Sequence, residues 1–165
     1  MSQGEDFGSI VDYDTARGRD YPTICQFTVF LENRVGVLLG LVRRFRGTRV
    51  RIMAISIIDS TECCILRMVL SHPEQGREIL ERAGLAMIES DLICLELNNS
   101  EQPLLEVCTA LLRAEVNLVQ TYPLMIQNSE RTLVAVMVDN TEIAQQTLAQ
   151  QGFNMLTENE LMDLS

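Results

Sequence analysis

The feature that most constrains the fold of this chain is an internal repeat, because its second half follows the same apolar pattern as its first half. Five apolar segments recur in the same order, with an offset of 66 residues up to about residue 122 and of 68 residues beyond it. The paired segments are 27–31 with 93–97, 38–45 with 104–111, 50–52 with 116–118, 63–70 with 131–138, and 84–88 with 152–156. Since self-similarity of this kind is the signature of a repeated structural unit, the sequence predicts two copies of one design.

The spacing of apolar residues predicts the same order of elements in each copy. Alternating or continuous apolar residues predict strands, whereas apolar residues three and four positions apart predict amphipathic helices. The first copy has predicted strands over 23–31, 50–58, 63–70 and 85–89 and predicted helices over 35–46 and 73–83. The second has predicted strands over 92–97, 116–126, 131–138 and 153–156 and predicted helices over 103–114 and 141–151. Asn140 or Thr141 is expected to cap the last helix, and Gly152 to end it.

The order βαββαβ in each copy describes a split βαβ unit, in which an antiparallel sheet carries both helices on one face. We therefore expect an α+β protein made of two tandem ferredoxin-like domains, at residues 22–90 and 91–165. Residues 1–21 are polar and acidic and contain several glycines, which predicts a flexible N-terminal arm.

Composition indicates a cytoplasmic protein and argues against several kinds of site. No apolar run reaches the roughly 18 residues that a membrane span needs, and the N-terminal segment lacks the apolar core of a secretory signal. The five cysteines are an odd number, sit in apolar segments and show no Cys-x-x-Cys spacing, which suits reduced thiols. Because His72 is the only histidine in the sequence, we expect no metal site, and no cofactor motif is present.

The charged residues argue against further classes of function. All 13 basic residues are arginines, which excludes a lysine Schiff base and a P-loop lysine. The net charge of −10 opposes general nucleic-acid binding. The segment 43–51 is a local exception with five arginines. This cluster is either a solvated helix end, where cations complement the helix dipole, or a patch for an anion or a partner.

A short polar turn, Glu32-Asn33-Arg34-Val35-Gly36, separates the first predicted strand from the first predicted helix. Gly36 has no Cβ that would keep a ligand away from the backbone. The first amides of the following helix lack partners within the helix, so they suit a carboxylate. The turn is therefore either a cradle for a ligand or a connection that only permits the chain to change direction.

This turn and the residues after the helix resemble an ACT domain. ACT domains commonly carry Asp-Arg-Pro-Gly-x-Leu at the turn and Gly-Ile-Asn-Ile at the step into the next strand. Here the two segments are Asn33-Arg34-Val35-Gly36-Val37-Leu38 and Arg49-Val50-Arg51-Ile52, in which Asn33, Val35 and Arg49 replace the Asp, the Pro and the later Gly. The first half is also similar to the small regulatory subunit of acetolactate synthase.

The resemblance covers residues 23–161 as two tandem copies, and the ending 152–161 is similar to small stand-alone tandem ACT proteins. It implies a non-catalytic regulatory protein that senses a small ligand, usually an amino acid. In such domains the ligand sits against the turn after the first strand, where two domains pack sheet edge to sheet edge. The implied ligand-binding residues are Asn33, Arg34, Val35, Gly36, Val37 and Leu38 in the first copy and Asn99, Glu101 and Gln102 in the second. Because Gln102 stands where the first copy has Gly36, the second site is expected to be altered or lost, or to use Glu101 and Gln102 for a different ligand.

The expected partners are an amino acid, a second copy of the chain and a metabolic enzyme. A βαββαβ sheet has open edges and one uncovered face, so we expect association through sheet edges, either between the two halves of one chain or between two chains in a homodimer. An alternative function is a ligand-free interaction module, or a detached regulatory subunit of an enzyme of amino-acid biosynthesis. RNA binding is disfavoured because the segment 63–70 offers no aromatic side chain on which bases could stack. The sequence shows no nucleophile–base pair and no phosphate-binding loop, so we do not expect an enzyme. Neither a nucleic acid nor a membrane is an expected partner.

Overall fold

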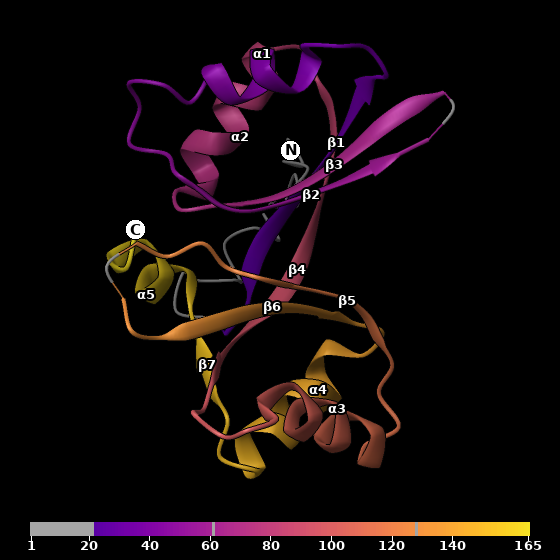
Figure 1. Cartoon of the computed structure of the whole chain (residues 1–165), viewed down its shortest axis with the longest axis vertical. Coiled ribbons are helices and arrows are strands. Elements are labelled where there is room, and N and C mark those ends of the chain that lie inside the picture. Colours follow the sequence, from indigo (N-terminus) through magenta and orange to yellow (C-terminus); the bar gives the residue numbers. More distant parts are fainter. Residues whose placement is uncertain (1–21, 61, 128) are drawn as a thin grey trace, which may run out of the picture.

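The computed structural model describes residues 22–60, 62–127 and 129–165, so the predicted arm at 1–21 lies outside the described residues. The described chain is an α+β protein with the tandem ferredoxin-like arrangement that the sequence predicts (Figure 1). The first copy contains β1 (Ile24–Glu32), α1 (Val37–Arg43), β2 (Ile52–Asp59), β3 (Cys63–Leu70) and α2 (Pro73–Arg82), and β4 (Ala86–Leu97) follows. The second copy contains α3 (Pro103–Arg113), β5 (Leu118–Pro123), β6 (Thr132–Val138), α4 (Thr141–Gln150), β7 (Asn154–Leu156) and α5 (Glu158–Asp163).

Strand β4 belongs to both copies. Its first seven residues pair antiparallel with β1, and its last five pair antiparallel with β6. The sequence predicts a strand ending at Glu89 and another beginning at Leu92, but the polar residues between them keep their register, with Ser90 opposite Gln26. One hydrogen-bonded sheet in the order β2-β3-β1-β4-β6-β5 results, with β7 added beside β4. The boundary that the repeat predicts after residue 90 falls inside this strand.

Helix α1 is shorter than the predicted helix over 35–46. It begins after Gly36, whose φ of 88° lies in the left-handed region. Beyond Arg43 the chain winds more tightly, because the N–H of Arg44 bonds to the carbonyl of Leu41 and the N–H of Phe45 to that of Val42. The helix predicted over 35–46 therefore extends three residues past the end of α1.

Helix α5 has no counterpart among the predicted elements. Thr157 starts it with a capping box, in which the Thr157 hydroxyl accepts from the Glu160 N–H and the Glu160 carboxylate accepts from the Thr157 N–H. The helix has six residues and holds Leu161, which is 2% exposed, in the core. Its shortness is the reason why no periodicity marks it in the sequence.

The core has three parts, and the middle one joins the two copies. We call the part of the sheet formed by β1, β2, β3 and the start of β4 the first sheet, and the part formed by the end of β4, β5, β6 and β7 the second sheet. Helices α1 and α2 pack on the first sheet and α3 and α4 on the second. The two pairs of helices lie at opposite ends of the molecule, so the helix-free faces of the two sheets look toward each other (Figure 1). Between these faces lies a cluster that we call the shared core. Its fully buried members include Ile24, Met53 and Val69 from the first copy and Leu92, Cys94, Leu133 and Leu156 from β4 and the second copy. The face that an isolated βαββαβ sheet leaves uncovered is therefore covered within the chain.

A buried amide sits beside this shared core. Gln26, which is 1% exposed, donates to the hydroxyl of Ser90 at 3.1 Å and accepts from the hydroxyl of Tyr122 at 2.6 Å. Burial raises the pKa of Tyr122, so its hydroxyl keeps the proton that it donates. Because a buried amide without partners is costly, this arrangement stabilises one particular packing of the two copies.

Candidate functional site

The turn between β1 and α1 is built around the backbone of Gly36. Its φ of 88° and ψ of −10° are strained for any residue with a Cβ, although an added Cβ would meet no atom within 4 Å. No side chain caps α1, and the Gly36 carbonyl accepts the N–H of Gly40 at 2.9 Å. The conformation of the backbone, and not crowding, is therefore what selects glycine here.

The polar side chains of this turn already have partners. Asn33 donates through Nδ2 to Oδ1 of Asp59 at 2.7 Å and to the carbonyl of Ser60 at 3.1 Å, which ties the turn to the β2–β3 hairpin. Arg34 forms a 2.8 Å ion pair with Glu32, and both side chains are largely exposed. An exposed pair of this kind contributes little to stability, so Arg34 can exchange partners at small cost.

The apolar residues of the turn differ in role. Val35 is fully exposed, whereas Val37 and Leu38 are half-buried and pack against the core between α1, α2 and the first sheet. The turn thus presents an open, solvent-facing strip of backbone between two anchored ends. Of the six residues that the sequence predicts for this site, Val35 and Gly36 expose the backbone and the other four hold it in place or flank it.

The corresponding loop of the second copy has a different form. Asn99, Glu101 and Gln102 are exposed, and Gln102 has φ −136°, which any residue can adopt. Asn98 donates to Glu106 at 2.7 Å and accepts from the N–H of Ser100, so this loop bonds to itself. Hydrogen bonds from Ser100 and Asn98 lower the pKa of Glu106.

The two predicted site loops lie at opposite ends of the molecule (Figure 1). The β1–α1 turn is at the far end of the first copy, and the loop before α3 is at the far end of the second. One small ligand therefore cannot touch both loops of the same chain.

The sequence of residues 22–165 matches the family model described as an ACT domain pair. The chain belongs to this family. The match covers both copies and agrees with the resemblance of the turn and with the tandem arrangement of the fold.

Solved structures share the fold of this ACT domain pair. Protein BT0572 from Bacteroides thetaiotaomicron is similar with a TM-score of 0.77 and 21% identity, over 86% of this chain and 97% of that chain. The ligand-free regulatory subunit of aspartate kinase from Thermus thermophilus is similar with a TM-score of 0.50 and 14% identity, over 78% of this chain and 91% of that chain. No curated protein matches the sequence.

Two hollows of the ACT pair lie elsewhere than at the predicted loops. The larger is a groove with a volume of about 700 Å³, where the end of α1 and the start of β2 meet the β5–β6 segment and α5. The smaller, of about 90 Å³, lies between the start of α2 and α5. The groove draws residues from both copies, so no local pattern marks it in the sequence apart from the arginine cluster at its rim.

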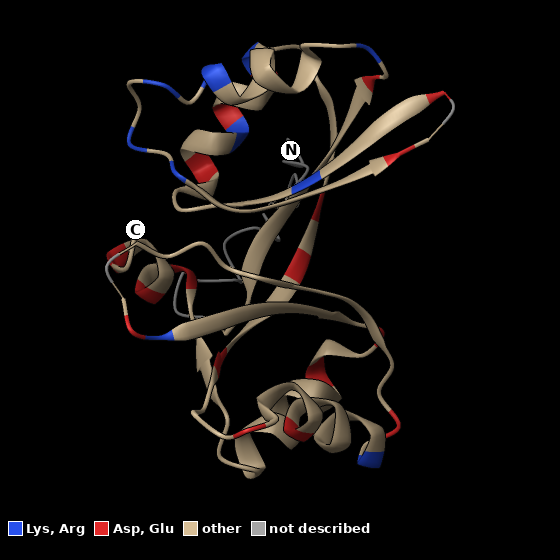
Figure 2. Cartoon of the chain, viewed as in Figure 1, with Lys and Arg blue, Asp and Glu red and all other residues tan. Residues whose placement is uncertain are grey.

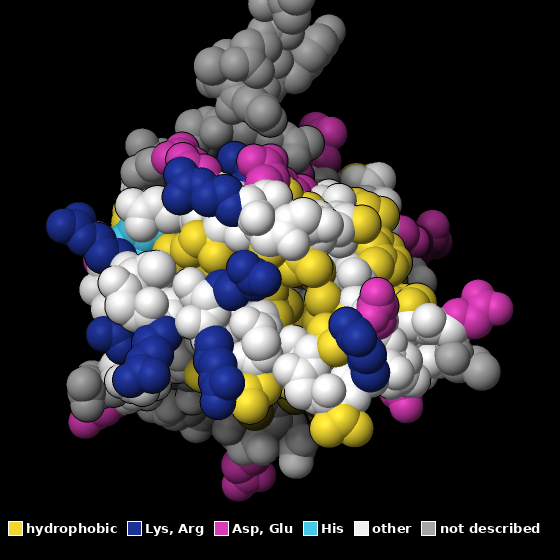
Figure 3. Space-filling model, turned by 90° about the horizontal axis from the view of Figure 1, so that it is seen from above, with side chains coloured by type: hydrophobic (Ala, Val, Ile, Leu, Met, Phe, Trp, Pro, Cys, Tyr) yellow, Lys and Arg dark blue, Asp and Glu magenta, His cyan; other side chains and the backbone are white. Residues whose placement is uncertain are grey.

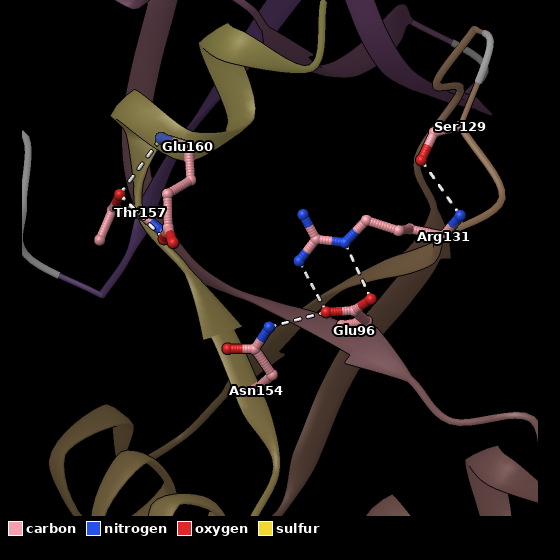
Figure 4. Close-up of polar contacts among 6 residues, drawn as sticks. All are labelled: Glu96, Ser129, Arg131, Asn154, Thr157 and Glu160. Atoms are coloured by element: carbon pink, nitrogen blue, oxygen red, sulfur yellow. Dashed lines mark hydrogen bonds and ion pairs between the residues drawn. The ribbon is translucent and has the colours of Figure 1, made fainter.

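Glu96 on β4 is tied to both neighbouring segments of the second copy (Figure 4). Its carboxylate accepts from Nε and Nη2 of Arg131 at 2.8 and 2.6 Å, and it also accepts from Nδ2 of Asn154 on β7 at 2.7 Å. These bonds, chiefly those from Arg131, lower the pKa of Glu96 to about 2. Because the carboxylate is satisfied from within the chain, it fastens β4 to β7 and to the residue that directly precedes β6.

We expect Glu96→Gln to lower the free energy of unfolding at neutral pH by about 1 kcal/mol, since the pair is partly exposed and screened. The pKa of Glu96 is lower in the folded state than the ordinary value of 4.5. The contribution of ionised Glu96 to the free energy of unfolding is therefore complete above about pH 4.5 and is lost as the pH falls toward about 2. Urea denaturation across this range should show the loss in the wild type but not in the variant. Glu130→Gln removes an exposed neighbouring carboxylate as a control, and equal pH profiles for Glu96→Gln and the wild type would contradict the assignment.

The described residues hold no group of three or more His, Cys, Asp or Glu side chains able to bind a metal ion. The five cysteines are free, and burial raises the pKa of Cys25 and raises that of Cys94 to about 12, so neither thiol is ionised at neutral pH. Within residues 22–60, 62–127 and 129–165, every helix is too short or too polar to cross a bilayer.

Proposed function

We propose that this ACT domain pair is a non-catalytic regulatory protein that binds an amino acid at the β1–α1 turn. The observation that carries the proposal is the turn of the first copy, where Gly36 leaves the backbone open beside the start of α1. A carboxylate would be held there by backbone amides, and Arg34 is free to exchange its exposed partner for a ligand. We assign weaker or no binding to the second copy, because Gln102 places a side chain at the equivalent position.

A second candidate is a detached regulatory subunit that docks on a metabolic enzyme. It is supported by the likeness in fold to a protein that is named as the regulatory subunit of an enzyme, aspartate kinase. In that case the amino acid would be optional, and the turn would be only a connection. We place either form of the protein in the cytoplasm, as a homodimer that associates through sheet edges.

Titration calorimetry of the whole chain against the twenty amino acids tests the proposal, with Gly36→Asn as the decisive variant. Asn tolerates a positive φ better than other residues, and its side chain would cover the first amides of α1. Gly152→Asn is the matched control, because Gly152 has a φ of 81° and equally open surroundings in the second copy. Both variants should lose similar stability, of about 1 kcal/mol or less.

We expect at least about tenfold weaker amino-acid binding in Gly36→Asn and unchanged binding in Gly152→Asn. Unchanged affinity in a folded Gly36→Asn protein would show that the turn is only a connection. If none of the twenty amino acids binds the wild type, the ligand-free regulatory subunit becomes the better description.

A further inference from the structure

The arginine cluster between α1 and β2 has no acidic partner among the described residues. It consists of Arg43, Arg44, Arg46, Arg49 and Arg51, all of them exposed. None of the ion pairs in the described part of the chain involves these side chains. Figure 2 shows this segment as the most basic part of the molecule, and the face seen in Figure 3 carries arginine side chains with hydrophobic ones between them.

The cluster stands out against the charge of the whole chain. Residues 22–90 hold nine arginines and seven acidic residues, whereas residues 91–165 hold two arginines and eleven acidic residues. Five like charges within nine positions repel one another, and the chain as a whole carries a net charge of −10. Cations near the end of α1 complement its dipole, but this effect fades within one turn and accounts only for Arg43 and Arg44.

Two of the remaining arginines, Arg46 and Arg51, line the groove of about 700 Å³ between the copies. The groove also has an apolar wall. Phe45 and Met53 from the first copy are 6% and 1% exposed, and Met125 from the second copy is 54% exposed. At this place the two copies are joined by the N–H of Met125, which donates to the carbonyl of Met53 at 2.6 Å.

The charges in the groove favour one class of ligand. Arg46 and Arg51 supply two guanidinium groups, and Asp163 on α5 supplies one carboxylate, so these three side chains leave a net positive charge of one. A guanidinium group binds carboxylate, sulfonate and phosphate oxygens through paired hydrogen bonds, and the apolar wall favours a ligand with a hydrocarbon part. We propose that this groove binds a small organic monoanion with an apolar body, at a site separate from the β1–α1 turn.

The position of the groove gives such binding a consequence for the whole chain. Its walls come from both copies, so a ligand there contacts the first copy through Arg46 and Arg51 and the second through Met125. A ligand that binds only the folded state stabilises it by mass action. Occupancy of the groove therefore strengthens the packing of the two copies against each other.

The dye 8-anilinonaphthalene-1-sulfonate is a suitable probe, because it joins an apolar ring system to one sulfonate. Its neutral counterpart, N-phenyl-1-naphthylamine, has the same rings and no charge. Fluorescence titration of the whole chain with both dyes separates the anionic contribution from apolar binding. The charged dye should bind the wild type with one site per chain and more tightly than the neutral dye.

Two double variants with the same change in net charge test the location. Arg46→Gln with Arg51→Gln removes both guanidinium groups from the groove, whereas Arg43→Gln with Arg44→Gln removes two exposed arginines that do not line it. We expect about tenfold weaker binding of the charged dye in the first variant and less than about threefold in the second. The affinity of the neutral dye should be the same in both, and circular dichroism should confirm that both variants fold.

An equal loss of charged-dye affinity in the two double variants would overturn the proposal, because it would reveal only a general effect of charge. Unchanged affinity in the groove variant would also overturn it. The Gly36→Asn variant leaves the groove intact, so it should bind the charged dye as the wild type does. A failure of the groove proposal is thus distinguishable from a failure of the turn as an amino-acid site.

Discussion

Residues 22–90 and residues 91–165, produced as separate fragments, are expected not to fold on their own. A cut after residue 90 divides β4, which pairs with β1 before the cut and with β6 after it. It also exposes the shared-core side chains Ile24, Met53 and Val69, each 1% exposed in the whole chain. Burial of one such side chain contributes about 1.5–3 kcal/mol, so their combined loss is comparable with the roughly 5–15 kcal/mol that stabilises a typical domain.

Circular dichroism and amide hydrogen exchange on each fragment, alone and after mixing, provide the measurement. The separate fragments should show little protection, and the mixture should recover part of it, because the two copies complete each other's core. A fragment that unfolds cooperatively by itself would show that the copies are independent folding units.

Leu92→Ala is expected to lower the free energy of unfolding of the intact chain by about 2–5 kcal/mol. Leu92 is 1% exposed, lies opposite Ile24 in the β1–β4 register, and belongs to the shared core. Because β4 serves both sheets, amide exchange should accelerate in the first copy as well as in the second. Leu112→Ala on α3 is the matched control, since the Leu112 side chain is 76% exposed and its loss should change stability by less than about 0.5 kcal/mol.

Urea denaturation gives the change in stability, and hydrogen exchange assigns it to one copy or to both. Faster exchange confined to the second copy would contradict a common unfolding unit. A loss of stability in Leu112→Ala as large as that in Leu92→Ala would show that burial is not the cause.

Local features of the chain follow directly from the sequence. The repeat predicts the order of helices and strands in both copies, and the structure follows this order except that two predicted strands join as β4 and that α5 is added at the end. The cap of α4 is an example at the level of atoms, since the Asn140 side chain accepts from the N–H of Ile143 at 3.1 Å. Gly36 is another, because the change from alternating to helical spacing marks the place where the backbone must turn. Each of these features depends on contacts within a few residues, and the pattern of neighbouring side chains encodes such contacts.

The candidate sites were predictable only in part. The sequence points to the β1–α1 turn as a ligand cradle, but it does not show that Asn33 is tied to Asp59 and Ser60 on the β2–β3 hairpin. The groove beside Arg46 and Arg51 had one signal, the cluster of arginines, and that signal did not identify the wall formed by Met125. Partners that lie far apart in the chain produce no spacing that a single sequence can display.

The sequence by itself determined that this protein consists of two βαββαβ copies, with an open glycine turn in the first and a side chain at the equivalent position in the second. Only the tertiary structure decided that the two predicted strands around Ser90 form one strand, that the helix-free faces cover each other, and that a groove opens between the copies. The physical reason is the distance along the chain between the residues that interact. Helices and turns are stabilised by neighbours three or four residues away, whereas the joining of the copies depends on pairs such as Tyr122 with Gln26, which lie 96 residues apart in the sequence.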